Sequence, residues 1–241
     1  VRPIDSLSKI TEIFEKGSVL DLPVVDPDGI LLGAVTHDDL VRTIQKDATL
    51  DLQTMVGASK EERALSTPLF TVKKRMPWLQ INLLTAFMAA AVVGIFEATI
   101  AQVTALAVLL PVVAGQSGNT GAQALAVTMR GLALREITVH QWAKVLRKEV
   151  IAGFLNGVGI AVTCGIGVFI WSQSIGLVAV IMSSMILAMV AAGFAGALIP
   201  VILTRLGQDP ATSSSIILTT VTDIAGLFAF LGIATILMRF L

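Results

Sequence analysis

The sequence has few charged residues and a single cysteine, and both facts exclude some classes of protein. Lysine, arginine, aspartate and glutamate make up 14% of the 241 residues, whereas hydrophobic residues make up 55%. This composition is too apolar for an ordinary soluble domain. Cys164 has no second cysteine to pair with, which excludes an intrachain disulfide. No cleavable signal peptide is expected, because the first long apolar run begins only after residue 77.

The few charges are concentrated at one end of the chain. Residues 1–75 hold 10 of the 17 basic and 12 of the 17 acidic residues, and the remaining 166 residues hold 7 and 5. The formal net charge is zero, which argues against a nucleic-acid partner. We therefore expect three parts: a polar head at 1–56, a linker with a basic collar at 57–76, and a membrane body at 77–241.

The head has the pattern of a small α/β unit. Apolar residues at helical spacing predict a helix within 4–14, and two short apolar runs at 22–26 and 30–35 predict a hairpin whose turn contains Gly29. Thr36 is expected to cap a second helix, with Asp38 and Asp39 in the first turn, where carboxylates favour the helix dipole.

The residues at 22–26, Gly29 and the run 33–39 resemble a CBS domain, a regulatory module named after cystathionine β-synthase. In such modules a Gly-x-x-Thr-x-x-Asp stretch binds adenosine nucleotides, so the resemblance implies that Thr36 contacts phosphate and Asp39 the ribose of ATP. The alternative is that Thr36 and Asp39 form only a helix cap. CBS modules work in pairs, which implies that this sequence carries the second module of a longer protein.

The body has five apolar segments long enough to cross a bilayer, which needs about 20 residues. They lie at 78–96, 100–129, 150–171, 177–203 and 212–238. We therefore predict an all-α polytopic membrane protein with a small α/β cytosolic segment at its N-terminus. Trp78 and Trp171 fall at the expected interfaces, where indole rings are favoured.

The basic residues predict the orientation of these spans. Lys and Arg cluster before the first span, between the second and third, and between the fourth and fifth, whereas the loops at 97–99 and 172–176 have none. The positive-inside rule then places the N-terminus in the cytoplasm and the C-terminus outside, in a cell or inner membrane.

The second span contains an unusual polar motif. Pro111, Gly115, Gly118, Asn119 and Gln123 lie within a hydrophobic segment. Proline removes a backbone donor and glycine weakens the helix, and the freed carbonyls are tolerated at membrane depth only against protein or water. These groups either face a hydrated ion or hold helices together through amide hydrogen bonds.

The fifth span carries an aspartate near its middle. Asp223 shares a helical face with Thr219, Thr220 and Gly226, and no basic residue lies near it in the segment. A carboxylate at this depth costs about 2.5–3.5 kcal/mol on insertion scales, so such a group normally faces protein or water. It indicates an ion path, a proton relay, or a buried acid that is hydrogen-bonded to the threonines or held protonated.

Taken together, these motifs resemble the signature of the MgtE magnesium-transporter family. The resemblance rests on Pro111-x-x-x-Gly115-x-x-Gly118-Asn-Thr-Gly-Ala-Gln123, on Asp209-Pro-Ala211 and on Thr220-x-x-Asp223. It implies a homodimer in the lipid bilayer that conducts Mg²⁺ through a central pore lined by the second and fifth spans of both subunits. The residues implied to line the pore are Pro111, Gly115, Gly118, Gln123, Thr219, Thr220 and Gly226. Asp223 would be the selectivity carboxylate, with Asn119 close by.

The family resemblance also implies a cytosolic Mg²⁺ sensor that closes the pore. Asp39, Asp47, Asp51 and Asp209 match acidic positions of the family, whereas Ser18, Arg42 and Leu50 stand where further acidic residues are expected. The alternative is that these aspartates are solvated surface charges, and that Asp209 caps the fifth span.

Two rival functions remain on the sequence alone. One is a carrier that couples a divalent cation to Na⁺ or H⁺. The other is an intramembrane aspartyl hydrolase, which needs two carboxylates that share a proton. Only Glu97 and Asp209 are further candidates for that pair, a Gly-x-Gly-Asp stretch is absent, and neither histidine lies in a span. We therefore expect a protein that is not an enzyme.

Overall fold

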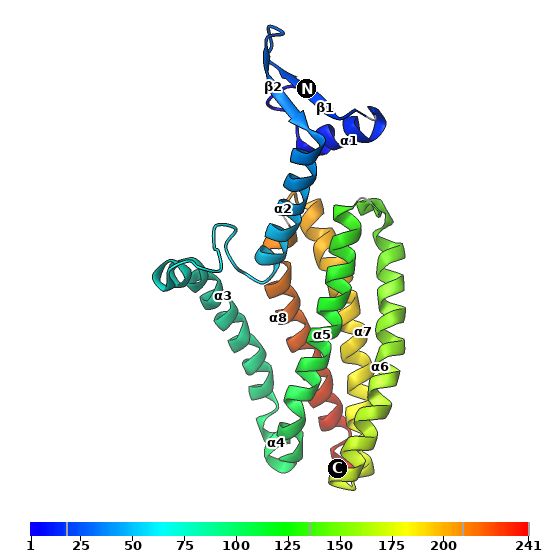
Figure 1. The fold of residues 1–241 in the computed structure, drawn as a ribbon. Coiled ribbons are helices and arrows are strands. Elements are labelled where there is room, and N and C mark those ends of the chain that lie inside the picture. Colours follow the sequence, from blue (N-terminus) through cyan, green and yellow to red (C-terminus); the bar gives the residue numbers. More distant parts are fainter. Residues whose placement is uncertain (18, 135, 209, 241) are drawn as a thin grey trace. The chain divides into compact units, whose positions relative to one another are not determined.

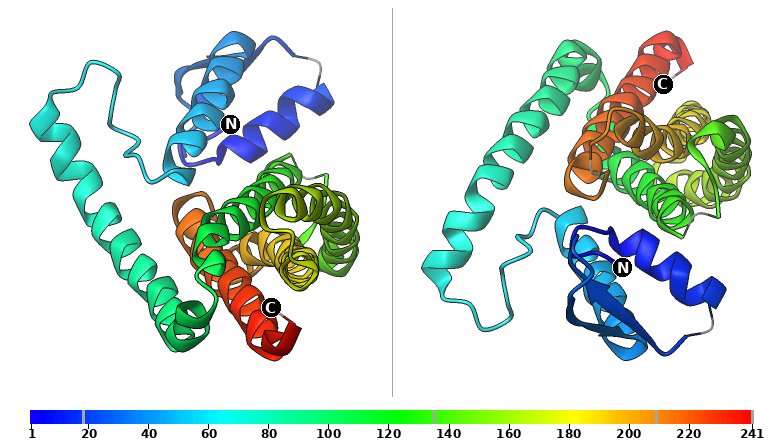
Figure 2. Two further views of the ribbon diagram at one scale, coloured as in Figure 1. Left: turned by 90° about the horizontal axis from the view of Figure 1, so that it is seen from below. Right: turned by 90° about the horizontal axis from the view of Figure 1, so that it is seen from above.

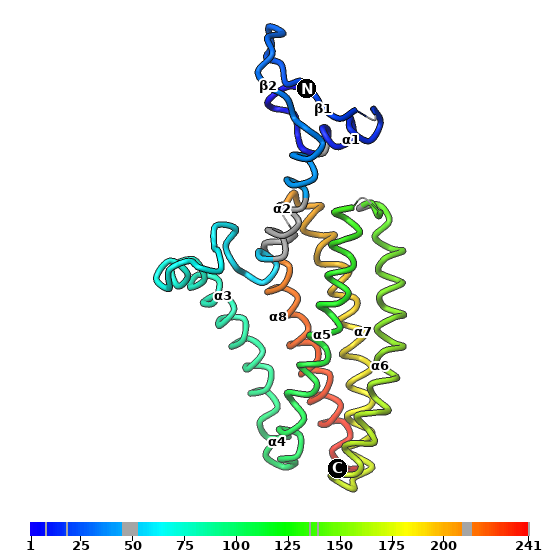
Figure 3. Tube along the Cα trace, viewed as in Figure 1, coloured from blue at the N-terminus to red at the C-terminus, as the bar shows by residue number. Residues whose placement is uncertain are grey.

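The computed structural model describes the whole chain except residues 18, 135, 209 and 241, and it leaves the side chains of 8, 45–52, 139 and 210–213 undescribed (Figure 3). The chain divides into two compact units, Val1–Gln53 and Thr54–Leu241. Each unit is considered by itself.

The N-terminal unit is a hairpin with a helix on either side of it in the sequence. Its elements are α1 (Leu7–Gly17), β1 (Asp21–Val25), β2 (Leu31–Thr36) and the start of α2 (His37–Met55). The strands are antiparallel, with Leu22 opposite Val35. Asp26 closes the turn by accepting hydrogen bonds from the backbone N–H groups of Asp28 and Ile30, at 2.9 and 2.8 Å. Phe14, Leu22 and Leu40 form the small core, so the predicted order of helix, two strands and helix is confirmed.

The second unit consists mainly of long helices. They are α3 (Pro68–Ile95), the short α4 (Glu97–Gln102), α5 (Ala105–Ala133), α6 (Trp142–Ser172), α7 (Ile175–Arg205) and α8 (Pro210–Ile236), with 3₁₀ turns at Val139–Gln141 and Met238–Phe240 (Figure 1). Among the described residues, α3, α6, α7 and the part of α8 from Ser214 are long and apolar enough to cross a membrane. The prediction of a helical, polytopic membrane protein with a small α/β segment is confirmed. The 29-residue α5 is as long as its neighbours and carries the polar motif.

Helix α7 is the centre of the bundle, and glycines let its neighbours approach closely (Figure 2). A Cβ on Gly153 of α6 would lie 2.6 Å from the carbonyl oxygen of Met189, and one on Gly193 of α7 would lie 2.6 Å from that of Glu149. One turn further along α7, a Cβ on Gly196 would lie 2.5 Å from the carbonyl oxygen of Gly121 in α5. Small residues at such contacts are the usual means by which helices pack in lipid.

Helices α6 and α7 are joined by only two residues. Gln173 adopts a left-handed conformation, with φ of 53°, and Ser174 caps α7 by accepting a hydrogen bond from the N–H of Leu177 at 3.2 Å. This tight connection holds the two 31-residue helices antiparallel.

Two helix boundaries differ from the sequence-based expectation. The first membrane helix begins at Pro68 rather than near residue 78, because proline is favoured in the first turn, where no N–H partner is needed. The second predicted span, 100–129, is divided. Helix α4 ends at Gln102, Val103 leaves helical geometry at φ −129° and ψ 80°, and α5 begins at Ala105. The hydroxyls of Thr99 and Thr235 lie 3.0 Å apart and tie α4 to α8.

Candidate functional site

The polar motif of α5 occupies an uninterrupted helix with two different faces. Pro111, Gly115, Asn119 and Gln123 recur every four residues and are exposed. No Cβ neighbour lies within 4 Å of Gly115 or Gly118, so these glycines border open space in the single chain. Pro111 cannot donate to the carbonyl of Ala107, which leaves that oxygen without its usual helical partner.

The amide side chains of this motif do not hold helices together within the chain. No side-chain hydrogen bond joins Asn119 or Gln123 to another of the described residues. The interpretation of these amides as helix glue therefore fails inside one chain, and both groups remain available to water, to a cation or to a second copy.

The polar stretch of α8 places its aspartate beside occupied hydroxyls. Thr219 and Thr220 donate to the carbonyl oxygens of Ser215 and Ile216, at 2.8 and 2.7 Å. Asp223 is half-buried, and no described residue donates a hydrogen bond to its carboxylate. The alternative of an acid bonded to the neighbouring threonines is therefore not what the structure contains.

A tight seam joins α5 and α8 at the level of these motifs. The Ser117 hydroxyl donates to the Val113 carbonyl at 3.0 Å and lies 3.5 Å from the carbonyl oxygen of Thr222. A Cβ on Gly226 would lie 3.1 Å from the Ser117 hydroxyl, so Gly226 belongs to the seam rather than to the open side of α8. The sequence analysis missed Ser117, because nothing in the sequence distinguishes it from the other polar residues of the motif.

The seam fixes the relative height of the two motifs but does not join their polar groups. Ser117 and Thr222 are in contact, and Asn119 and Asp223 are their near neighbours in the sequence. Within the part of the chain that is described, Asn119 and Asp223 make no hydrogen bond to each other. A site that uses both groups would therefore need water, a cation or a second chain between them.

The structure offers few protein ligands for a tightly bound metal. Over the described ranges, no three His, Cys, Asp or Glu side chains come together in a way that could hold an ion. One carboxylate with neighbouring carbonyl and amide oxygens suits a hard cation that keeps most of its water, as Mg²⁺ does.

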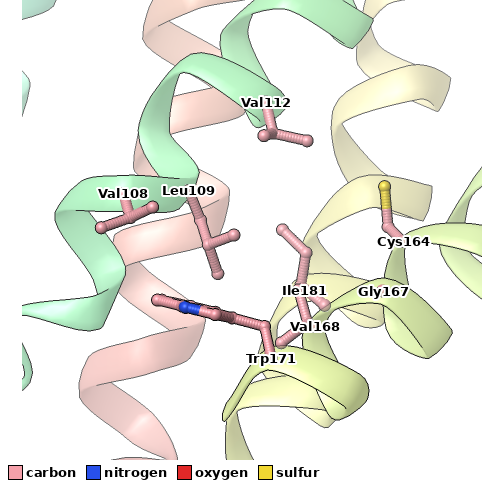
Figure 4. Close-up of a pocket in the computed structure, with 8 residues that line it drawn as sticks. All are labelled: Val108, Leu109, Val112, Cys164, Gly167, Val168, Trp171 and Ile181. Atoms are coloured by element: carbon pink, nitrogen blue, oxygen red, sulfur yellow. The ribbon is translucent and has the colours of Figure 1, made fainter.

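A groove of about 400 Å³ between α5, α6 and α7 is lined by apolar side chains, unlike the polar motifs of α5 and α8 (Figure 4). The Trp171 ring lies beside Leu109, and the Cys164 thiol lies on the far side of the groove. The remaining lining residues are Val108, Val112, Gly167, Val168 and Ile181. Because this lining has neither carboxylate nor amide side chains, the groove is not a candidate cation site.

Of the residues of the predicted Mg²⁺ sensor, the structure describes the side chain of Asp39 only. Asp39 is exposed, and its carboxylate accepts a hydrogen bond from the Thr36 hydroxyl at 2.8 Å, while Thr36 accepts one from the Asp39 N–H at 3.1 Å. This reciprocal pair caps α2, as the cap interpretation predicts. Helix α2 includes Asp47 and Asp51, but their side chains, like Asp209, lie outside the described residues.

The linker before α3 is held by two ion pairs that the sequence analysis did not foresee. Glu61 pairs with Lys74 at 2.5 Å, and the buried Glu62 receives two hydrogen bonds from the Arg75 guanidinium, one of them at 3.0 Å. The guanidinium lowers the pKa of Glu62 below its ordinary value. The sequence signal that could have predicted these pairs is two acidic residues, Glu61-Glu62, followed thirteen residues later by two basic residues, Lys74-Arg75.

These features define a class: a helical membrane protein in which an acid on a membrane-spanning helix has no partner among the described residues, and a neighbouring helix has an exposed polar face. Intramembrane acids of this kind mark ion or proton pathways. Comparison with known families gives the family itself. Residues 110–233 match the model of MgtE, described as a divalent cation transporter, and residues 1–46 match the CBS domain. The chain belongs to the MgtE family.

Curated relatives agree with this assignment. The chain is 32% identical to the magnesium transporter MgtE of Enterococcus faecalis over 98% of its length and 52% of that protein. It is 31% identical to the Bacillus subtilis MgtE over 94% of the chain and 50% of the relative, and 34% identical to that of Thermus thermophilus over 90% and 49%. The chain thus spans about half the length of these relatives. They are named transporters, in agreement with the absence of enzyme chemistry expected from the sequence.

Proposed function

We propose that the protein carries Mg²⁺ across a membrane through a pore formed by α5 and α8 of two identical chains. Three observations support this. The chain belongs to a family of divalent cation transporters, α5 leaves an unpaired polar face exposed, and the Asp223 carboxylate has no partner among the described residues. The last observation carries the proposal, because an unpartnered acid in a membrane segment needs water, a cation or a second subunit beside it.

The chemistry of Mg²⁺ fits such a site. Mg²⁺ prefers oxygen ligands and gives up its waters reluctantly. One Asp223 from each protomer would attract a divalent ion more strongly than a monovalent one. A water-mediated grip through these carboxylates and Asn119 would still release the ion, as conduction requires.

The other proposed pore residues would contribute in different ways. Pro111, Gly115 and Gly118 would expose backbone oxygens along the path, and Gln123, Thr219 and Thr220 would supply side-chain oxygens. Gly226 would act indirectly, by keeping α8 close to Ser117.

The direction of transport follows from the proposed orientation. With the basic collar at 73–75 and the basic segment between α5 and α6 on the cytoplasmic side, the N-terminal unit is cytoplasmic. The membrane potential would then draw the cation inward, at about 2.3 kcal/mol per charge per 100 mV and twice that for Mg²⁺.

The proposal includes regulation of the pore by the N-terminal unit. Mg²⁺ bound at Asp39, Asp47 and Asp51 of this unit, or at Asp209 of the second unit, would close the pore, and ATP would bind through Thr36 and Asp39. The hydrogen bonds between Thr36 and Asp39 compete with both roles, because they already occupy the groups concerned.

The experiment that tests transport is Mg²⁺ flux into liposomes that contain the full chain, with Asp223→Asn beside the wild type. The substitution keeps the size of the side chain and removes its charge, so we expect flux to fall to the level of empty liposomes while cross-linking still detects the dimer. Glu97→Gln is the matched control, since it removes an exposed carboxylate from the short helix α4, and it should retain flux. Normal flux through Asp223→Asn would refute the pore assignment.

The same liposomes separate a channel from a carrier. A channel should conduct Mg²⁺ with no Na⁺ or pH gradient present, whereas flux that requires one of these gradients would establish the coupled carrier instead. Ca²⁺, Mn²⁺ and Co²⁺ added as competitors would define the selectivity.

A further inference from the structure

The first two turns of α6 present three cations on its outer face. Lys144, Arg147 and Lys148 have the spacing i, i+3 and i+4, which places them side by side, and all three are exposed. Together with Ile151 they line a recess of about 430 Å³. A second recess, of about 270 Å³, shares Lys144 and Lys148 and extends toward α5.

The charges of this cluster are only partly compensated. Lys148 pairs with Glu149 at 2.5 Å, and the Glu149 side chain is buried, so this pair is part of the helix packing. Glu149 and Glu136 line the second recess but not the first. Lys144 and Arg147 make no ion pair with any residue that the structure describes, which leaves two cations without an acidic partner.

The cluster lies where lipid headgroups are expected. At 1.5 Å per residue α6 is about 46 Å long, whereas the hydrocarbon core of a bilayer is about 30 Å thick, so the charged end of the helix extends beyond that core. Trp142, with the Arg205 guanidinium 5.7 Å from its ring centroid, lies at the same end, as is usual for indoles at an interface.

An apolar stripe continues from the cations along the same outer side of α6. Its members are all exposed in the described chain and lie one to four turns further into the membrane: Ile151, Phe154, Leu155, Val158 and Val162. A cationic recess followed by an exposed apolar stripe matches both halves of a phospholipid. The orientation of the spans in the membrane requires positive charge on this side, but it does not require three cations on one helix face around a recess.

We propose that this surface, Lys144, Arg147 and Lys148 with the apolar stripe below them, binds an anionic phospholipid. The phosphate-bearing headgroup lies between Lys144 and Arg147, and an acyl chain lies along the stripe. Charge complementarity favours an anionic headgroup over a zwitterionic one, because the choline of a zwitterionic lipid would bring a further cation to the cluster. This inference depends on the membrane location of α6 and not on the transported ion.

The test is native mass spectrometry of the full chain in detergent, titrated with phosphatidylglycerol or with phosphatidylcholine. The wild type should bind phosphatidylglycerol more tightly. The double variant Lys144→Gln/Arg147→Gln should bind it about 30-fold more weakly, which corresponds to about 1 kcal/mol for each cation removed. Lys148 is left in place because its pair with Glu149 is structural.

Controls distinguish a site from general attraction and from misfolding. Arg63→Gln/Lys73→Gln removes two exposed cations elsewhere and should bind phosphatidylglycerol like the wild type. Lys144→Arg should keep the affinity, and inorganic phosphate should compete poorly because it lacks the acyl chain. An equal loss in both double variants, equal binding of the two lipids by the wild type, or full competition by inorganic phosphate would each overturn the proposal. An unchanged melting temperature of the α6 variant shows that it is folded.

Discussion

Replacement of Gly196 by alanine should loosen the contact between α7 and α5. The added Cβ would lie 2.5 Å from the carbonyl oxygen of Gly121 and 2.8 Å from the Cβ of Ala124. Ordinary contacts begin at 3.4 Å, so the two helices must separate locally by about 0.9 Å, and both near groups belong to helix α5 rather than to a flexible side-chain end. Overpacking of this kind costs about 1–3 kcal/mol. For a unit of this size we expect the melting temperature to fall by roughly 2–12 °C.

A matched control exists in the same bundle. Gly159 of α6 has nothing within 4 Å of its added Cβ, so Gly159→Ala introduces no clash and removes the conformational freedom of glycine, a gain of about 0.5–1 kcal/mol in a helix. The assay is thermal unfolding of both variants in the same detergent, followed by tryptophan fluorescence. If Gly196→Ala melts at or above the temperature of Gly159→Ala, the close approach of α5 and α7 is wrong.

Three further outcomes are expected. Because Arg75 lowers the pKa of Glu62 from 4.5, the stabilisation by this pair is present above pH 4.5 and is lost as the pH falls through the lowered pKa. Melting temperatures measured from about pH 7 to about pH 3 should therefore fall more steeply for the wild type than for Glu62→Gln. Parallel curves for the two proteins would contradict this prediction. Thr36→Ala should destabilise the N-terminal unit by about 1 kcal/mol in denaturant unfolding, because it removes the cap of α2. Thr36→Ser should destabilise the unit much less, since serine also caps helices. Equal losses of stability in the two variants would show that the cap is unimportant. Asn119→Ala should change the discrimination between Ca²⁺ and Mg²⁺ in liposome flux, and an unchanged ratio would remove Asn119 from the ion path.

Hydropathy and turn chemistry predicted most of the fold. The span expected at 177–203 is α7, Ile175–Arg205, because an unbroken apolar run longer than a bilayer has few alternatives to a helix. The head was equally predictable, since Gly29 in the turn and Thr36 at the helix start are local signals that need no knowledge of distant residues.

The break before α5 and the seam with α8 were not predictable in the same way. Val103 and Thr104 lie within a stretch, 97–110, that has no proline or glycine to mark a break, and the Thr99 hydroxyl just before them contacts Thr235, 136 residues away. The motif on α5 was visible in the sequence, but only the structure separates its exposed face, with Asn119, from its packed face, with Ser117. Side-chain partners of this kind are set by tertiary packing rather than by local pattern.

The two-residue connection between α6 and α7 restricts how this bundle can change shape. Gly153 and Gly193 bring the two backbones into direct contact, so sliding one helix along the other would drive carbonyl oxygens into neighbouring backbone atoms. Because Gln173 and Ser174 also connect α6 and α7 at one end, these two helices form a rigid hairpin. Any opening movement must then be taken up elsewhere, and Val103, where the backbone already departs from helical angles, is the natural hinge for α5 to swing against it.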